Sequence, residues 1–167
     1  LRAPTAGHTG TGSVGSMPTP EFVLRMREHM GRELLPLVGV TGVVVDDSGA
    51  VLLHRRADDG WWSTPGGIVE PGEQPADALV REIAEETGVH AVPERLASVV
   101  TEPPHTYPNG DQVQFLDITF RCRAIGGAAR ADGDESLDVG WFPRDGLPEM
   151  NARVIRRIRH AHDDGAA

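Results

Sequence analysis

Runs of apolar and β-branched residues, separated by short polar segments, predict a chain built mainly of strands. Two of these runs flank the turn Asp46-Asp47-Ser48-Gly49 and are predicted to form a hairpin. Other runs end at Pro103-Pro104 and at the turn-forming segment 107–111. The predicted strands cover residues 37–45, 50–56, 95–101, 112–124 and 137–142.

The predicted strand 112–124 has one mostly apolar face. Strict alternation places Asp117 on the opposite face, so Asp117 is expected to point either to solvent or towards a ligand. Cys122 lies on the apolar face, which favours a packed structural thiol over a nucleophile. The residues expected to face the core are Gln114, Leu116, Ile118, Phe120 and Cys122.

Helical spacing appears near both ends of the chain. The first predicted helix starts at Thr19-Pro20-Glu21, a capping residue followed by proline and an acid, and runs to about Glu33. Its Met and Phe residues favour a packing role over a dimer contact. The last predicted helix covers 151–162, and its arginines are expected to form a solvated basic surface: Arg153, Arg156, Arg157 and Arg159.

A third helix is predicted over 76–87, with Pro75 in its first turn and Gly88 just past its end. One face carries apolar residues at spacings of three and four: Ala76, Leu79, Val80 and Ile83. The residues Pro65-Gly66-Gly67 predict a sharp turn ahead of this helix, where side chains cannot crowd the backbone.

The other face of this helix carries Glu82, Glu85 and Glu86. Like charges at this spacing destabilise a helix by about 0.2–0.5 kcal/mol per pair. They also lie near the C-terminal end, where the helix dipole disfavours anions. A hard divalent cation with oxygen ligands would neutralise them, whereas the plainer alternative is a solvated acidic face.

The segment 67–89 resembles the Nudix box, written G-x5-E-x7-R-E-U-x-E-E-x-G-U, where U is aliphatic. Nine fixed positions within twenty-three residues leave little room for chance, although the resemblance becomes less specific towards residues 37 and 148. The matched residues are Gly67, Glu73, Arg81, Glu82, Ile83, Glu85, Glu86, Gly88 and Val89.

The resemblance implies the α/β Nudix fold, in which a mixed sheet lies between α-helices. The implied activity is hydrolysis of the pyrophosphate bond in a nucleoside diphosphate linked to another moiety, with Mg²⁺ or Mn²⁺ as cofactor. Glu82, Glu85 and Glu86 are then metal-binding and catalytic carboxylates, and Glu82 is the preferred candidate to touch the proton of the attacking water. The Gly67 carbonyl is expected to reach a metal. Arg81 and Glu73 are expected to act mainly as scaffold, with Glu73 as a remote, water-mediated ligand.

Two other functions fit the same resemblance. A Nudix domain can hold a nucleotide as a sensor without cleaving it, but loss of a box carboxylate would be expected and none is lost. A metal-dependent isomerase on the same fold would need additional catalytic groups, and Cys122 in mid-strand does not suggest one.

Residues outside the box are also candidates for the site. Arg55 and Arg56 form either a phosphate clamp or a solvated pair. Trp61 and Tyr107 are candidates to stack on a base, whereas the neighbouring Trp62 is expected to pack in the core.

Glu135 lies in a polar loop, 126–136, at an offset that resembles a metal ligand or base in triphosphate-cleaving members of the family. The alternative is a solvent-exposed acid in a mobile loop. Spacing hints for substrate are inconclusive, because Pro104 and Tyr107 are each one residue away from the family's positions. Pro103-Pro104 slightly favours ADP-ribose-like compounds.

Composition limits the remaining possibilities. The length of 167 residues predicts one domain, 17–163, after an expression-vector remnant or disordered tail at 1–16 and before a disordered tail at 164–167. The net charge of −9 argues against nucleic-acid binding, and no apolar run is long enough to span a membrane. The absence of lysine excludes Schiff-base chemistry, and the single cysteine fits a reducing, cytoplasmic compartment. A homodimer is left open.

Overall fold

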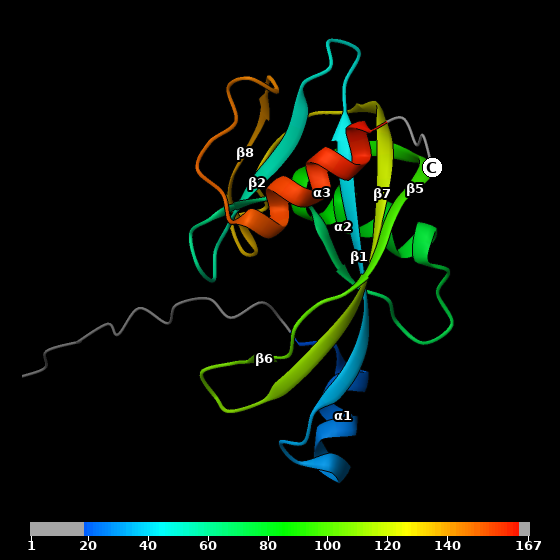
Figure 1. Cartoon of the computed structure of the whole chain (residues 1–167), viewed down its shortest axis with the longest axis vertical. Coiled ribbons are helices and arrows are strands. Elements are labelled where there is room, and N and C mark those ends of the chain that lie inside the picture. Colours follow the sequence, from blue (N-terminus) through cyan, green and yellow to red (C-terminus); the bar gives the residue numbers. More distant parts are fainter. Residues whose placement is uncertain (1–18, 164–167) are drawn as a thin grey trace, which may run out of the picture.

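The computed structural model describes residues 19–163, with three helices and eight strands (Figure 1). The expected tag or tail at 1–16 and the expected tail at 164–167 lie outside the described residues. None of the described helices has the length and apolarity needed to cross a membrane. The elements are α1 Glu21–Met30, β1 Leu35–Val45, β2 Val51–Arg56, β3 Trp62–Ser63, β4 Gly66–Ile68, α2 Pro75–Thr87, β5 Val89–Thr101, β6 His105–Thr106, β7 Gln112–Gly127, β8 Ser136–Phe142 and α3 Ala152–His162.

The strands form one mixed sheet in the order β3-β2-β1-β7-β5, and β4, β6 and β8 pair with β1, β7 and β2 respectively. Strands β1 and β7 run parallel over eleven paired positions, and every other pairing is antiparallel. Helix α3 lies on one side of this sheet and α2 on the other (Figure 1). The α/β/α architecture expected from the sequence is therefore confirmed.

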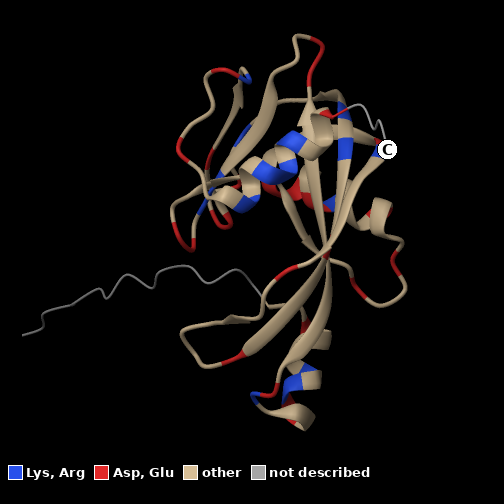
Figure 2. Ribbon diagram, viewed as in Figure 1, with Lys and Arg blue, Asp and Glu red and all other residues tan. Residues whose placement is uncertain are grey.

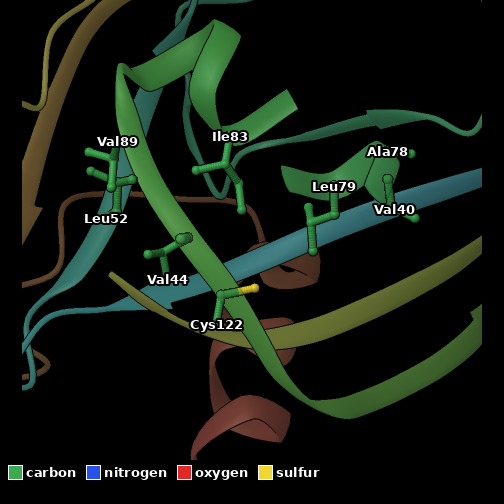
Figure 3. Close-up of a cluster of buried hydrophobic side chains, with 9 residues drawn as sticks. Val40, Val44, Leu52, Ala78, Leu79, Ile83, Val89 and Cys122 are labelled. Carbon is green, nitrogen blue, oxygen red and sulfur yellow. The ribbon is translucent and has the colours of Figure 1, made fainter. Parts of the chain in front are cut away.

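Alternate residues of β1 supply both sides of the core, because successive side chains of a strand point to opposite faces. Val40 and Val44 pack with Leu79 and Ile83 of α2 and with Cys122 of β7 (Figure 3). The residues that alternate with them, Val43 and Val45, pack with α3 instead. Cys122 is fully buried and burial raises the pKa of its thiol to about 12, so the structural role predicted for it is confirmed.

Helix α1 covers the far end of the sheet, where β1 begins (Figure 1). Val23 is buried with Leu35, Leu37 and Val113, and Phe22 and Met26 pack against this cluster. The packing role predicted for this helix is confirmed.

The strand predictions are largely right, with informative exceptions. Strands β1 and β2 pair only at Val45 and Val51, whereas β2 pairs along its length with β8 and β1 pairs with β4. Strand β5 starts six residues before the predicted 95, and Pro93 is tolerated there because β5 is at the edge of the main path and its register shifts between Pro93 and Arg95. The short strands β3, β4 and β6 were not predicted.

The prediction for Asp117 is wrong on both alternatives. Asp117 is 4% exposed, and its side chain is paired rather than directed to solvent or a ligand. Arg157 of α3 donates from Nε to Asp117 Oδ2 at 3.0 Å, and its Nη2 lies 2.8 Å from Oδ1. Thr41 and Thr119 donate their hydroxyls to the same carboxylate at 2.8 and 2.9 Å. The physical reason is that α3 covers this face of the sheet, so a polar position is enclosed.

Two further surface predictions are corrected. Leu116, expected in the core, is 40% exposed because α2 does not extend over that part of β7. The arginines of α3 form a basic band along the helix (Figure 2), but two of them are engaged with the sheet. Arg157 binds Asp117, and Arg156 donates to the buried Glu102 at 2.6 Å.

Candidate active site

The segment 66–74 leads from β4 into α2 and is shaped by close backbone contacts. Gly66 and Gly67 are strand residues paired with Thr41 and Val40, so the sharp turn predicted there is wrong. As predicted, however, neither position has room for a side chain. A Cβ on Gly66 would lie 2.1 Å from the Val40 carbonyl oxygen, and one on Gly67 would lie 2.1 Å from Glu82 Oε1.

Helix α2 has the predicted bounds and ends at Gly88, which adopts the left-handed conformation with φ of 69°. Its buried face differs from the predicted one. Ala78, Leu79 and Ile83 are buried, whereas Val80 is 38% exposed. This orientation turns Glu86, the last member of the predicted acidic face, towards the interior.

Glu86 is the most enclosed carboxylate of the box, at 1% exposure. Its Oε2 accepts the Gly66 N–H at 2.9 Å. Burial raises the pKa of Glu86 well above its usual value, and the nearby charges of Glu82 and Glu135 raise it further, while the Gly66 hydrogen bond opposes them. A negative charge in this position calls for a compensating cation.

Arg81 connects the other carboxylates of the box. It binds Glu73 through two hydrogen bonds, from Nε at 2.9 Å and from Nη2 at 3.0 Å. Its Nη1 donates to Glu82 at 3.0 Å and to Glu85 at 3.1 Å. These contacts fit the scaffold role predicted for Arg81 and Glu73.

Glu135 precedes β8 and lies within electrostatic reach of the helix. Burial raises its pKa, and the charge of Glu82 is the next largest cause. Its backbone is fixed by two hydrogen bonds: the Ala57 N–H donates to the Glu135 carbonyl at 2.9 Å, and the Glu135 N–H donates to Asp132 Oδ1 at 3.1 Å. The charge of Glu135 also raises the pKa of Glu86, so Glu135 lies within electrostatic reach of both carboxylates.

Comparison with known proteins fits this arrangement. The family model for the NUDIX domain matches residues 35–161. The chain belongs to the Nudix family. A MutT-like protein of Streptomyces ambofaciens is 38% identical over 117 residues, which is 70% of each chain. An ADP-ribose pyrophosphatase of Methanocaldococcus jannaschii is 34% identical over 119 residues, covering 70% of this chain and 68% of that protein. The crystal structure of a MutT NUDIX hydrolase from Burkholderia pseudomallei superposes with a TM-score of 0.61 at 30% identity, covering 75% of this chain and 97% of that one.

Nudix hydrolases generally need a divalent metal ion. Within residues 19–163, no three His, Cys, Asp or Glu side chains are gathered closely enough to enclose a cation. Instead, the Arg81 guanidinium contacts both Glu82 and Glu85. The donor set nevertheless fits such an ion, because every candidate ligand is an oxygen and a cation would favour the charged form of Glu86, which burial disfavours.

The residues expected to bind substrate in this Nudix hydrolase are only partly brought together. Arg56 pairs with Asp58 and lies 3.7 Å from Asp59, and Arg55 donates to the Gly60 carbonyl at 3.0 Å. Burial raises the pKa of Tyr107, which the charge of Arg56 opposes, so these two side chains share a neighbourhood.

The two tryptophans lie in different environments, as the sequence predicted. Trp62 packs edge-to-face on Phe142, with ring centroids 4.8 Å apart, in the core beneath α3. The core role predicted for it is confirmed. Trp61 is 43% exposed and free to present its ring to a ligand, so base stacking by Trp61 stays a prediction.

His54, which sequence analysis missed, lies beside the Glu86 carboxylate of this Nudix site. His54 of β2 is 1% exposed, and its Nε2 lies 4.0 Å from Glu86 Oε2. Its Nδ1 lies 2.8 Å from the hydroxyl of Ser136. The signal in the sequence was a histidine directly after the apolar run Val51-Leu52-Leu53, where an aliphatic residue would satisfy the strand.

The two glycines of β4 offer a matched pair of variants. Gly67→Ala places a methyl against Glu82, a side chain that can move, so the protein is expected to fold with its kcat lowered at least about ten-fold. Gly66→Ala places the methyl against the Val40 backbone, which cannot move without distorting β1. It is therefore expected to lose several kcal/mol of stability. Thermal melts and steady-state kinetics of both proteins measure the difference, and equal melting temperatures would contradict this account.

Proposed function

We propose that this Nudix hydrolase cleaves the pyrophosphate bond of a nucleoside diphosphate linked to another moiety, by attack of water on a phosphorus atom. The observation that carries the proposal is that Glu82, Glu86 and Glu135 lie within electrostatic reach of one another, and that burial and neighbouring carboxylates raise the pKa of each. A polyanionic pyrophosphate can approach this site only if cations lie between the two sets of negative charges.

We propose Mg²⁺ or Mn²⁺ as the cation. Glu82, Glu85 and Glu86 would hold it, with the Gly67 carbonyl and Glu135 as further ligands. When bound, such an ion neutralises phosphate charge, lowers the pKa of water and stabilises the leaving oxygen. The absence of a side chain on Gly67 keeps its backbone close to Glu82.

The chain's own residues supply orientation and proton transfer. Glu82 is the proposed acceptor of the water's proton, because it is half-buried and adjoins Gly67, whereas Glu86 is fully enclosed. Arg81 keeps Glu73 and the helix in a fixed relation through its paired hydrogen bonds. Glu135 is proposed to act as a ligand or a base from its loop.

For the substrate, we place ADP-ribose-like compounds ahead of nucleoside triphosphates. The support is the relative named as an ADP-ribose pyrophosphatase and the Pro103-Pro104 segment. Relatives named as a putative 8-oxo-dGTP diphosphatase and as a nucleoside triphosphatase keep triphosphates, oxidised ones included, as the second candidate. Arg55 and Arg56 are proposed to contact phosphate, and Trp61 and Tyr107 to stack on the base.

A substrate screen tests this proposal. ADP-ribose, nucleoside triphosphates including oxidised ones, dinucleoside polyphosphates, nucleotide sugars and CDP-choline are compared by kcat/KM with Mg²⁺ or Mn²⁺. The highest value is expected for an ADP-ribose-like compound. Trp61→Ala and Tyr107→Ala should raise KM by about ten-fold, as expected for loss of a stacking contact, while Trp61→Phe retains most of the affinity. Turnover of only non-nucleotide phosphates would overturn the substrate class.

Two further properties are proposed on narrower grounds. A homodimer is supported by an apolar surface on the α2 side of the sheet, beyond the end of α2. The exposed Val38 pairs with the exposed Leu116 there, and the exposed Val99 lies on the adjoining strand; exposed apolar groups that adjoin one another are typical of interfaces. A cytoplasmic location is supported by the single cysteine.

A further inference from the structure

A short chain of buried polar groups lies beneath α2 and reaches from the helix to the loop before β8. His54 stands between Glu86 on one side, at 4.0 Å, and the Ser136 hydroxyl on the other, at 2.8 Å. Ser136 is fully buried and directly follows Glu135. Two carboxylates that are far apart in the sequence are therefore connected through two side chains.

The ring of His54 is enclosed between Glu86 and Ser136 with 1% exposure, and such burial favours the neutral imidazole. A neutral imidazole donates through one nitrogen and accepts through the other. With the proton on Nε2, the ring presents an N–H to Glu86 while Nδ1 accepts the Ser136 O–H. The other tautomer would turn a lone pair towards the carboxylate, whereas the Ser136 hydroxyl can pair with either form of Nδ1 and so permits the orientation with Nε2–H facing Glu86.

The loop that precedes β8 lies at the Ser136 end of this chain of polar groups, and hydrogen bonds hold it to Ser136. Asp132 Oδ1 accepts the N–H groups of Asp134, Glu135 and Ser136 at 3.1, 3.1 and 2.9 Å. The pairing of β2 with β8 shifts register between Arg55 and Arg56, which places Ser136 opposite Arg56. Any movement of Ser136 therefore moves the backbone of Glu135.

A buried histidine at this position has a free-energy cost that packing alone does not offset. It continues the buried apolar run Val51-Leu52-Leu53, where burying a polar ring without partners is unfavourable. Its polar neighbours, which are Glu86, the Ser136 hydroxyl and the Thr64 backbone, offset that cost, and the first two belong to the candidate site or to the segment adjoining it.

We propose that His54 and Ser136 are positioning residues that hold Glu86 and Glu135 in a fixed relation, so that both present oxygens to one cation. The inference deepens the proposed function and rests on it. Groups behind metal ligands that orient them in this way typically contribute 10–100-fold, as an order of magnitude, to metal affinity or activity.

Three variants test the proposal, and a fourth serves as control. Ser136→Ala removes the hydroxyl, His54→Leu removes the polar contacts of the ring but suits an apolar strand, and Ser136→Thr retains the hydroxyl. The control is Thr119→Val, which deletes another buried hydroxyl, the donor to Asp117 on the α3 side of the sheet. The Kd for Mn²⁺ is measured by counting free Mn²⁺ in electron paramagnetic resonance titrations, together with the apo melting temperature, kcat and KM.

Ser136→Ala and His54→Leu should each raise the Mn²⁺ Kd by about ten-fold and lower kcat by about as much, with KM little changed. Ser136→Thr should restore most of both values. Thr119→Val should lower the melting temperature but keep the wild-type Mn²⁺ Kd and kcat. Folded His54→Leu and Ser136→Ala proteins with wild-type Mn²⁺ affinity would overturn the proposal, as would an equal loss in Thr119→Val. If the wild type turns over no nucleotide, the proposed function fails, yet the Mn²⁺ titration still decides the positioning role.

Discussion

Glu86→Gln is expected to lower kcat by two orders of magnitude or more while the protein remains folded. The amide keeps the size of the side chain and an oxygen to accept the Gly66 N–H, but it removes the charge. Groups that stabilise charge in the reaction are typically worth about 2.7–4 kcal/mol. Glu82→Gln is expected to act in the same direction.

The same substitution should leave apo stability equal to or above that of the wild type. Burial and the charges of Glu82 and Glu135 disfavour ionised Glu86, and a neutral amide avoids this cost. In contrast, the rise in melting temperature that Mg²⁺ produces in the wild type should be lost, because that rise reports binding to the folded state.

A matched control for these variants is Glu94→Gln. Glu94 is an exposed carboxylate on β5 that pairs with Arg123, and it should keep wild-type kcat and the wild-type response to Mg²⁺. Near wild-type hydrolysis by both Glu82→Gln and Glu86→Gln would contradict the assignment of catalysis to this site.

The second large effect is on stability, through the ion pair beneath α3. Arg157→Met is expected to cost about 3–5 kcal/mol of unfolding free energy, because it leaves the Asp117 charge buried with only Thr41 and Thr119 as partners. For a chain of this size that corresponds to a drop of roughly 10 °C in melting temperature. Urea denaturation followed by circular dichroism provides the measurement.

Two variants distinguish this cause from general damage to α3. Arg157→Met combined with Asp117→Asn removes both charges and should recover most of the loss, since no uncompensated charge remains. Arg153→Met alters an exposed arginine of the same helix and should change stability by less than about 0.5 kcal/mol. A loss below about 1 kcal/mol for Arg157→Met would show that the buried charge is not a major cost.

Features that depend on local spacing were predictable. The helix over 76–87, its proline start and its glycine end follow from residues within a few positions of each other, and α2 has these bounds. The contacts of Arg81 with Glu73 and Glu85 were predictable for the same reason.

Features that depend on how both faces of the sheet are covered were not predictable. Asp117 alternates with apolar residues and reads as an outward position, but α3 encloses that face and supplies Arg157. Glu86 reads as part of an exposed acidic stripe, yet its burial depends on Gly66 and His54, which come from other strands. His54 itself had no local signal beyond a polar residue at the end of an apolar run.

The central claim is that water attacks a phosphorus atom at the carboxylate site. The most direct test is incubation of the wild-type protein with ADP-ribose and Mg²⁺ in ¹⁸O-labelled water, followed by mass spectrometry of the products. The account predicts Mg²⁺-dependent release of AMP and ribose 5-phosphate, with one ¹⁸O in a product phosphate, and release at least about a hundred-fold slower by Glu86→Gln. Tight binding of nucleotide and metal with no labelled product from any compound of the substrate screen would contradict the account and identify the chain as a nucleotide sensor.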